Sequence, residues 1–215
     1  MFALTGIDHR YGRTPVLAID DWSAAAGEHW LLAGPSGSGK TTALHLLAGL
    51  CAPTAGRVSV GGVELATLRG AALDRWRGRS VGLVPQRLHL VGALDVLDNL
   101  RLARYLAGLP DEPTRALLLL EAMGIDGLAR RMPRQLSQGQ AQRVAVARAV
   151  VNHPALLLAD EPTANLDDAH AQATLLLLRA QAVHVGATLV VASHDARVRP
   201  LLPRVFTLPP RTVSA

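Results

Sequence analysis

The sequence predicts an α/β fold with a largely parallel core sheet, and three observations support this prediction. Short apolar runs with the length of buried strands alternate with helical stretches along the 215 residues. A glycine-rich loop, 34–41, lies between an apolar run and a helical stretch. The first 27 residues contain two more apolar runs in a β-hairpin pattern. We therefore expect one domain, 1–215, with an N-terminal antiparallel β part and a mostly parallel sheet.

In the first half of the chain, the apolar runs that have strand character precede and follow the glycine-rich loop. Pro85 ends the last of these runs, 80–84, because proline has no N–H to donate to a sheet. A helical stretch over 43–48 comes directly after the loop, which gives it a strand–loop–helix context. The expected strands are 2–7, 16–20, 29–33, 57–60 and 80–84.

From about residue 87 the pattern becomes helical. Residues 94–106 and 114–123 have helical periodicity, interrupted by breakers at Gly108, Pro110 and Pro113. Ser137 can cap a further helix that runs through Val151. We expect these helices to form a subdomain, about 87–152, inserted into the sheet domain. The alternation then resumes, with a strand over 156–160, a helix over 167–185 and a strand over 187–193, and the last residues are too few for another domain.

Composition excludes several classes of protein. The net charge is +5, but the arginines are scattered, so we expect no nucleic-acid partner and instead a solvated basic surface or one that faces anionic lipid. Cys51 is the only cysteine, which excludes an internal disulfide and favours a reducing compartment. We expect no signal peptide, because the N-terminus lacks a basic region and a long apolar run. No apolar stretch approaches the ~20 residues that a membrane-spanning helix needs.

The glycine-rich loop reads GPSGSGKT and fits the phosphate-binding pattern G-x-x-x-x-G-K-[ST]. Glycines let backbone N–H groups curl around phosphates, and the following helix N-terminus adds partial positive charge. Lys40, the only lysine of the chain, can reach the β- and γ-phosphates as a compact charge. The residues expected to contact a nucleotide here are Gly34, Pro35, Ser36, Gly37, Ser38, Gly39, Lys40, Thr41 and Thr42.

A second motif narrows the class of nucleotide-binding protein. Residues 136–140 read LSQGQ and resemble the LSGGQ signature of ABC ATPases, and the helix-like run after them is similar to that of the family. A serine hydroxyl, free backbone amides and a helix N-terminus together form an anion site. The resemblance implies that Ser137, Gln138, Gly139 and Gln140 contact the γ-phosphate of ATP held by another protomer. Gln138 stands where the family has a glycine, the residue with the freest backbone.

The other family motifs follow in the family's order. Residues 156–161 resemble the Walker B strand and its glutamate, and Ser193-His194-Asp195 resembles the switch-histidine segment. The resemblance implies that Asp160, Thr41 and Gln86 hold Mg²⁺, and that Glu161 orients or deprotonates the attacking water. It further implies the catalytic set Glu161, His194, Gln86 and Lys40, an adenine-stacking role for Tyr11, and a dimer-interface loop over 165–167 that includes Asp167.

The resemblance covers nearly the whole chain and implies the nucleotide-binding subunit of an ABC transporter. Such a subunit has an ABC-type P-loop NTPase fold and hydrolyses ATP with Mg²⁺ at a head-to-tail dimer interface. Its expected partners are an integral membrane permease and a second ATPase subunit, identical or not. The expected location is peripheral, on the cytoplasmic face of the cell's inner membrane.

The branch of the family is less sharply specified by the motifs. Residues 160–167, DEPTANLD, are close to the DEPTGNLD run of the lipoprotein-release, macrolide-export and cell-division group, and 94–100 also resembles that group. Against this, Val84-Pro85-Gln86 resembles a run found in some metal and siderophore importers. We favour an exporter-like subunit. The alternatives are an ATPase that regulates a membrane complex without moving cargo, and a non-transport ABC ATPase. The sequence does not identify a substrate.

Overall fold

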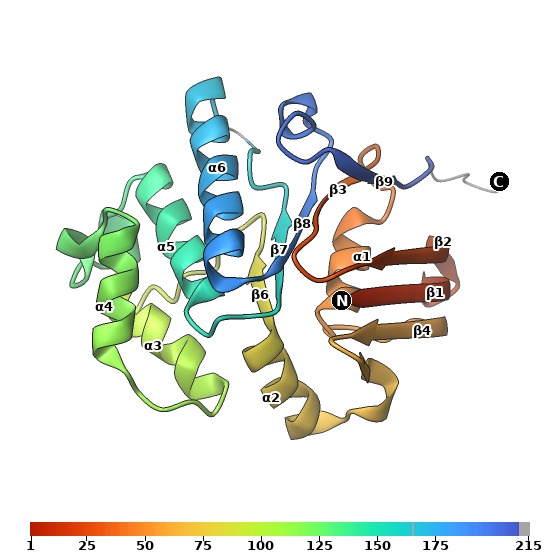
Figure 1. Ribbon diagram of the computed structural model, residues 1–215, viewed down its shortest axis with the longest axis horizontal. Coiled ribbons are helices and arrows are strands. Elements are labelled where there is room, and N and C mark those ends of the chain that lie inside the picture. The colour runs from red at the N-terminus through yellow and green to blue at the C-terminus, as the bar shows by residue number, and fades with distance from the viewer. Residues whose placement is uncertain (165, 211–215) are drawn as a thin grey trace.

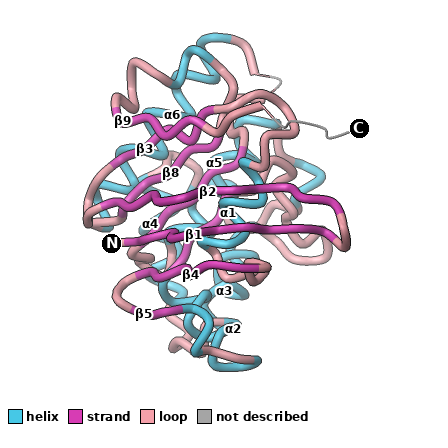
Figure 2. Tube along the Cα trace, turned by 90° about the vertical axis from the view of Figure 1, so that its right-hand side faces the viewer, coloured by secondary structure: helices cyan, strands magenta, loops and turns pink. Residues whose placement is uncertain are grey.

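The computed structural model describes residues 1–164 and 166–210, which form two β-sheets and the helices around them (Figure 1). The antiparallel sheet has the strand order β2-β1-β4-β5 and lies across one side of the molecule (Figure 2). Its strands are β1 (Phe2–Tyr11), β2 (Thr14–Ala24), β4 (Ala55–Val60) and β5 (Val63–Glu64). The expected N-terminal hairpin is therefore present, and both of its strands are longer than the apolar runs that predicted them.

The second sheet is parallel throughout and has the order β6-β7-β8-β3-β9. Its strands are β3 (His29–Ala33), β6 (Val81–Val84), β7 (Leu156–Asp160), β8 (Thr188–Ala192) and β9 (Arg204–Thr207). Every residue of β7 and β8 is buried, as expected for strands covered on both faces. The fold class predicted from the sequence, a mostly parallel sheet with an antiparallel part, is confirmed.

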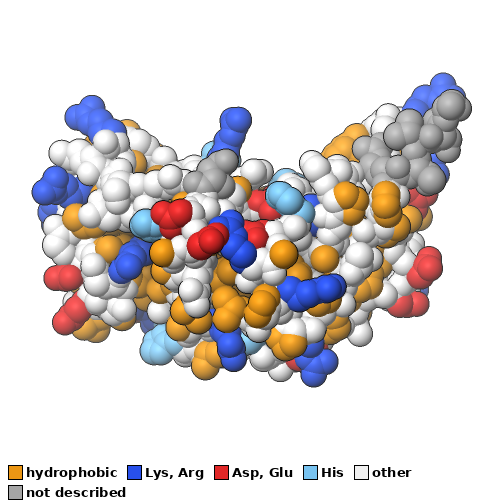
Figure 3. Space-filling view, turned by 90° about the horizontal axis from the view of Figure 1, so that it is seen from above, with side chains coloured by type: hydrophobic (Ala, Val, Ile, Leu, Met, Phe, Trp, Pro, Cys, Tyr) orange, Lys and Arg blue, Asp and Glu red, His pale blue; other side chains and the backbone are white. Residues whose placement is uncertain are grey.

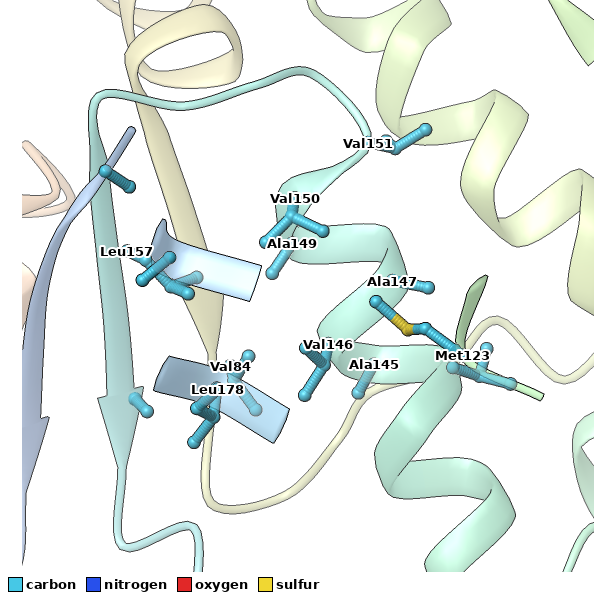
Figure 4. Close-up of a cluster of buried hydrophobic side chains, with 14 of the residues drawn as sticks. Val84, Met123, Ala145, Val146, Ala147, Ala149, Val150, Val151, Leu157 and Leu178 are labelled. Carbon is cyan, nitrogen blue, oxygen red and sulfur yellow. The ribbon is translucent and has the colours of Figure 1, made fainter. Parts of the chain in front are cut away.

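Alternate side chains of β7 point into two different core clusters. Leu156 and Leu158 pack in a cluster with the inner face of the antiparallel sheet and helix α1 (Lys40–Leu47). Leu157 and Ala159 pack in the other cluster, against α5 (Gln138–Val150) and α6 (Asp168–Val185) (Figure 4). The central sheet is thus fixed from both sides, and the ends of its strands are held in defined positions.

Between β6 and β7 the described elements are helical. They are α3 (Val96–Leu106), α4 (Pro113–Ala122), the short 3₁₀ turns η2 (Asp126–Leu128) and η3 (Pro133–Gln135), and α5. Asp95 caps α3 by accepting from the Asp98 N–H at 2.7 Å, so this helix begins at Val96 rather than at Leu94. Pro113, which the sequence analysis treated as a breaker, is instead the first residue of α4, where its missing N–H has no consequence.

Besides the two-residue strand β5 and the 3₁₀ turns, one helix and one strand were not expected from the sequence. Helix α2 (Gly70–Ser80) follows the 3₁₀ turn η1 (Leu65–Thr67), and β9 follows the 3₁₀ turn η4 (Ala196–Val198). β9 pairs with β3 and extends the core sheet by one strand. The segment after residue 193 therefore contributes a strand to the core sheet. None of the described helices is both long and apolar enough to cross a membrane.

Candidate active site

The candidate site residues lie at the carboxyl ends of neighbouring parallel strands. In the sheet order β6-β7-β8-β3, Gln86 follows β6, Asp160 and Glu161 come at the end of β7, His194 follows β8, and loop 34–39 follows β3. This edge is where open α/β sheets bind their ligands. Figure 3 views the molecule from above Figure 1, onto this edge, and shows acidic, basic and histidine side chains near the middle of the face.

The glycine-rich loop adopts a backbone that requires glycine at specific positions. Gly39, the N-cap of α1, has φ +95°, and a Cβ there would lie 2.8 Å from the backbone oxygen of Val16. Gly37 has φ +77° but open space around its Cα. The loop therefore packs directly on β2 at Gly39, while its tip, with Pro35 and Ser36, is exposed. Its backbone amides and the α1 N-terminus provide a site for an anion.

Lys40 is buried and its ammonium already has partners. Nζ donates to the backbone oxygens of Gly34, at 2.9 Å, and Pro35, at 3.1 Å, and lies 3.3 Å from Glu161 Oε1. The lysine is thus held inside the glycine-rich loop, where the sequence predicts the phosphate site. A phosphate that binds here must replace the carbonyl or carboxylate contacts of Nζ with its own oxygens.

Asp160 and Thr41 form the part of the site that fits a divalent cation. The Thr41 hydroxyl donates to Asp160 Oδ2 at 2.8 Å, whereas the buried Oδ1 atom has no hydrogen-bond partner among the residues that the structure describes. Burial raises the pKa of Asp160, although the Thr41 hydrogen bond acts in the opposite direction. No cluster of three or more His, Cys, Asp or Glu side chains in the described part of the chain could hold a metal. A hydroxyl and one orphaned carboxylate oxygen suit Mg²⁺ that takes its other ligands from phosphate and water.

Glu161 lies at the centre of the charged groups. Its backbone has φ +44°, a left-handed conformation fixed by its N–H, which donates to Ala192 O at 2.8 Å. Ser193 Oγ donates to Oε2 at 3.0 Å, and His194 Nδ1 lies 2.9 Å from Oε1. Burial acts to raise the pKa of Glu161, but these hydrogen bonds and the Lys40 charge outweigh it and lower that pKa. The carboxylate is therefore ionised and oriented by three side chains.

The structure brings His194 to Glu161, and it adds a residue that the sequence analysis missed. Ser193 is the last residue before His194, is buried, and orients the same carboxylate. The available signal was its position directly after a buried strand that neighbours β7 in the sheet. The side chain of His194 is 65% exposed, so the other face of its imidazole is open to a ligand.

Two predicted residues lie apart from this charged cluster. Gln86, two residues after the end of β6, is exposed and lies in the loop that leads from β6 to α3. Tyr11, the last residue of β1, is 55% exposed and packs edge-on against the ring of the buried His9, with centroids 4.9 Å apart. An exposed, side-supported aromatic ring is available for stacking on a nucleotide base.

The signature-like segment begins helix α5 with a reciprocal cap. Ser137 Oγ accepts from the Gln140 N–H at 3.3 Å, and Gln140 Oε1 accepts from the Ser137 N–H at 2.9 Å. Gln138 is the first helical residue and is not among the residues with positive φ. The absence of glycine at this position therefore causes no backbone strain. Ser137 and Gly139 line a hollow formed with residues of α4 and α6.

Asp167 caps α6 and is the sequence neighbour of Leu166, one of the residues that line that hollow. Its Oδ1 accepts from the His170 N–H at 2.8 Å, and the His170 ring nitrogen Nδ1 lies 2.8 Å from both carboxylate oxygens. These contacts, the backbone one first, lower the pKa of Asp167. Leu166 and His170 line the hollow together with Gly139. Asn165, which the sequence analysis placed in the same loop, lies outside the described residues.

Comparisons with known proteins point to one family. The family described as ABC transporter matches residues 17–164. The lipoprotein-releasing system ATP-binding protein LolD of Anaeromyxobacter dehalogenans is 42% identical over 91% of this chain and 83% of its own length. The macrolide export ATP-binding/permease protein MacB of Rhodopirellula baltica is 41% identical over 92% of this chain, which spans 30% of MacB.

Solved structures give the same result for the fold. A dimeric bacterial ABC transporter cassette, MJ0796, superposes with a TM-score of 0.87 at 32% identity, covering 97% of this chain and 94% of that one. The same cassette has been solved in a post-hydrolysis state bound to ADP and phosphate. CbiO1 of Clostridium perfringens, part of the CbiONQ transporter complex, has a TM-score of 0.85 at 28% identity, covering 96% of this chain and 84% of its own.

Proposed function

This chain belongs to the ABC transporter family and is an ATP-binding, ATP-hydrolysing subunit of that family, and we propose that it works as one half of a head-to-tail pair. Each ATP then lies between loop 34–41 of one subunit and residues 137–140 of the other. In support, Ser137 and Gly139 line a hollow that includes no residue of loop 34–41. A similar cassette is dimeric.

Binding of ATP uses groups that the fold has already positioned. The backbone amides of loop 34–41 and the Thr42 hydroxyl receive the phosphates, and Lys40 transfers its hydrogen bonds from Gly34 and Pro35 to them. Tyr11 stacks on the adenine, a contact worth about 1–3 kcal/mol. On the second subunit, the amides at the start of α5 and the Ser137 hydroxyl meet the γ-phosphate, and Asp167 is the sequence neighbour of Leu166, which lines the same hollow.

Mg²⁺ fits beside the phosphates because Asp160 Oδ1 is buried without a partner in the described part of the chain and Thr41 holds Oδ2. When bound, the cation neutralises charge on the β- and γ-phosphate oxygens. Asp160 and Thr41 would hold it, and Gln86 would reach it from the end of β6. Asp160 must be ionised to do so, and burial, which raises its pKa, makes a nearby cation stabilising for that carboxylate.

Hydrolysis is assigned to Glu161, and the observation that carries this assignment is its position between Lys40 and His194. Its carboxylate accepts a proton from water while the water oxygen bonds to the γ-phosphorus and the bridging oxygen leaves on ADP. Ser193 and His194 hold the carboxylate in place, and the open side of the imidazole faces the γ-phosphate. Gln86 orients the water.

Substitution of Glu161 tests this assignment. E161Q keeps the size of the side chain but cannot accept the proton, so the variant should bind ATP, accumulate as a dimer on size exclusion, and lose turnover. K40A should instead lose ATP binding, because the loop loses its cation. Wild-type turnover by E161Q would show that Glu161 is not the base, and normal nucleotide affinity in K40A would contradict the phosphate site.

We further propose that the work of this ATPase is delivered to a separate membrane permease, with the chain bound peripherally at the cytoplasmic membrane face. A cavity of 630 Å³ lies between α2, β6, α3 and α5, lined by both charged and apolar residues, including Arg77, Leu102 and Arg148. On the adjoining surface of α3, Tyr105 is 77% exposed and Leu106 is 65% exposed. Such a surface suits a short amphipathic segment of a permease.

Charge reversal tests the coupling surface. R87E and D98R reverse charges beside Gln86 and on α3 and should weaken membrane association and permease-stimulated ATPase activity, while the unstimulated ATPase activity stays near wild type. R134E, at an exposed arginine of η3, provides a matched control. Equal membrane association of R87E, D98R and R134E would remove the surface from consideration.

The exporter-like assignment is supported by the LolD and MacB relatives, and the alternatives have a direct test. The E161Q form, pulled down from native membranes with ATP and Mg²⁺, should recover a polytopic membrane protein. If that protein mediates transport in vesicles, the subunit is an exporter component; if it binds only a cell-wall enzyme, the regulatory alternative holds. Recovery of soluble proteins or nucleic acid alone would favour a non-transport ATPase.

A further inference from the structure

Arg197, in the turn η4 that follows β8, bridges two loops next to the catalytic carboxylate. Its Nε donates to both carboxylate oxygens of Asp195, each at 2.9 Å, and its Nη2 lies 2.7 Å from Asp195 Oδ2. Its Nη1 points the other way and donates to Asp168 Oδ1 at 2.7 Å and to the backbone oxygen of Leu166 at 3.3 Å. One guanidinium therefore joins the segment after β8 to the start of α6.

Asp195 is anchored on its other side as well. Thr163 Oγ1 donates to Asp195 Oδ2 at 2.7 Å, and the Arg197 N–H donates to Oδ1 at 2.9 Å. The Arg197 guanidinium, first among several donors, holds the pKa of the Asp195 carboxyl well below its usual range. The side chain of Asp195 is only 15% exposed, so the pair has a fixed partner geometry rather than a mobile surface contact.

The network continues to Glu161. The Asp195 N–H donates to Ser193 Oγ at 3.1 Å, and Ser193 Oγ donates in turn to Glu161 Oε2 at 3.0 Å. Residues 193–195 and their hydrogen bonds thus connect the Glu161 carboxylate with Arg197. Arg197 in turn contacts Asp168 at the start of α6. Glu161, Thr163, His194, Asp195 and Arg197 all line one hollow of 320 Å³.

We propose that Arg197 is a positioning residue for ATP hydrolysis, which ties the segment carrying His194 to the segment that runs from Glu161 to α6. This inference rests on the proposed roles of Glu161 and His194. A planar fork with donors on two sides can hold two acceptors at a fixed separation, which a point charge cannot. The loop from Glu161 to Asp167 ends at the proposed dimer surface, so its arrangement relative to His194 matters when a second subunit closes over the nucleotide.

The experiment compares R197A with R199A, both purified as the full chain. Arg199 is exposed and lies two residues further along, and its side chain makes no hydrogen bond or ion pair with the described part of the chain, so R199A removes the same charge without the network. Steady-state ATPase activity with Mg²⁺ gives kcat and KM for ATP, and a fluorescent ATP analogue gives nucleotide affinity. R197A should lose kcat by about tenfold or more with KM within about twofold, since misplaced groups cost rate more than binding.

Two further variants keep the test decisive if R197A folds poorly. D168A removes the contact of Arg197 with α6 and leaves its contacts with Asp195, so it should lower kcat by less than R197A does. The double variant R197A/D168A should have the same kcat as R197A. R197K keeps the charge but loses the fork and should recover part of kcat. Equal kcat in R197A and R199A, or additive losses in the double variant, would overturn the proposal. Loss of activity in all variants with E161Q still active would place the error in the catalytic assignment instead.

Discussion

The contact between Gly39 and β2 gives a sharp prediction, because Gly37 in the same loop provides an internal control. G37A and G39A both place a Cβ on a residue with positive φ, at a cost of about 1–2 kcal/mol each. Only at Gly39 does the new Cβ meet other atoms, 2.8 Å from Val16 O and 3.1 Å from Leu17 Cδ1. That overlap must push β2 and the loop apart, for a further ~1–3 kcal/mol.

Thermal unfolding of the nucleotide-free chain measures the difference. For a domain of this size each kcal/mol lowers Tm by about 2–4 °C, so G37A should lose about 2–8 °C and G39A clearly more. Circular dichroism at matched protein concentration suffices, with isothermal titration of ATP at a temperature where both variants are folded. G39A should also bind ATP more weakly, because the first amide of α1 moves. Equal Tm values for the two variants would refute the argument that the loop packs on β2 through Gly39.

Three more predictions concern the cap, the acidic network and the core. S137A removes one half of the reciprocal cap of α5 and should lower the free energy of unfolding by about 1 kcal/mol. It should also weaken ATP-driven dimerisation, and unchanged dimer formation by the double variant S137A/E161Q would contradict the role of Ser137. The folded-state pKa of Asp195 lies below its ordinary value of 3.8, so its contribution to stability is present above that pH and lost as pH falls further. D195N should therefore be less stable than wild type at neutral pH, with the gap closing in acid denaturation below about pH 4; a constant gap would oppose this. L178A empties a fully buried position in the cluster between α5, α6 and the sheet and should cost about 2–5 kcal/mol in a denaturant titration, whereas the exposed Leu176 provides an L176A control that should change little.

The elements that the sequence predicted each have a local sequence pattern that specifies them. β7 and β8 are short apolar runs, and α5 has a serine cap with a glutamine three residues later. Helix α2 was missed because its signal is weak: none of its residues is fully buried, and its contact with the core includes the half-buried Trp76 but no long apolar stripe. β9 was missed because it is a partly exposed edge strand, and its pairing with β3 depends on a contact between residues about 175 positions apart in sequence.

The same distinction holds for the candidate site. Lys40, Asp160, Glu161 and His194 are found because each belongs to a motif with fixed local spacing, and the structure places them together. Their catalytic roles stay predictions that the substitutions above test. Arg197 has no spacing signal, since its meaning comes from three acceptors supplied by separate segments. Such a bridging residue becomes visible only when the loops are placed in space.

The order β6-β7-β8-β3 has a consequence for how the enzyme can be controlled. Adjacent strands in any sheet lie about 4.8 Å apart, so the sheet sets the spacing between the residues at the ends of its strands. Close-packed side chains cover both faces of the sheet and resist compression. Adjustment of the reaction rate within one subunit is therefore confined to the loops beyond the strand ends. A partner protein therefore changes the reaction rate most easily by moving the two subunits of the proposed pair toward or away from each other.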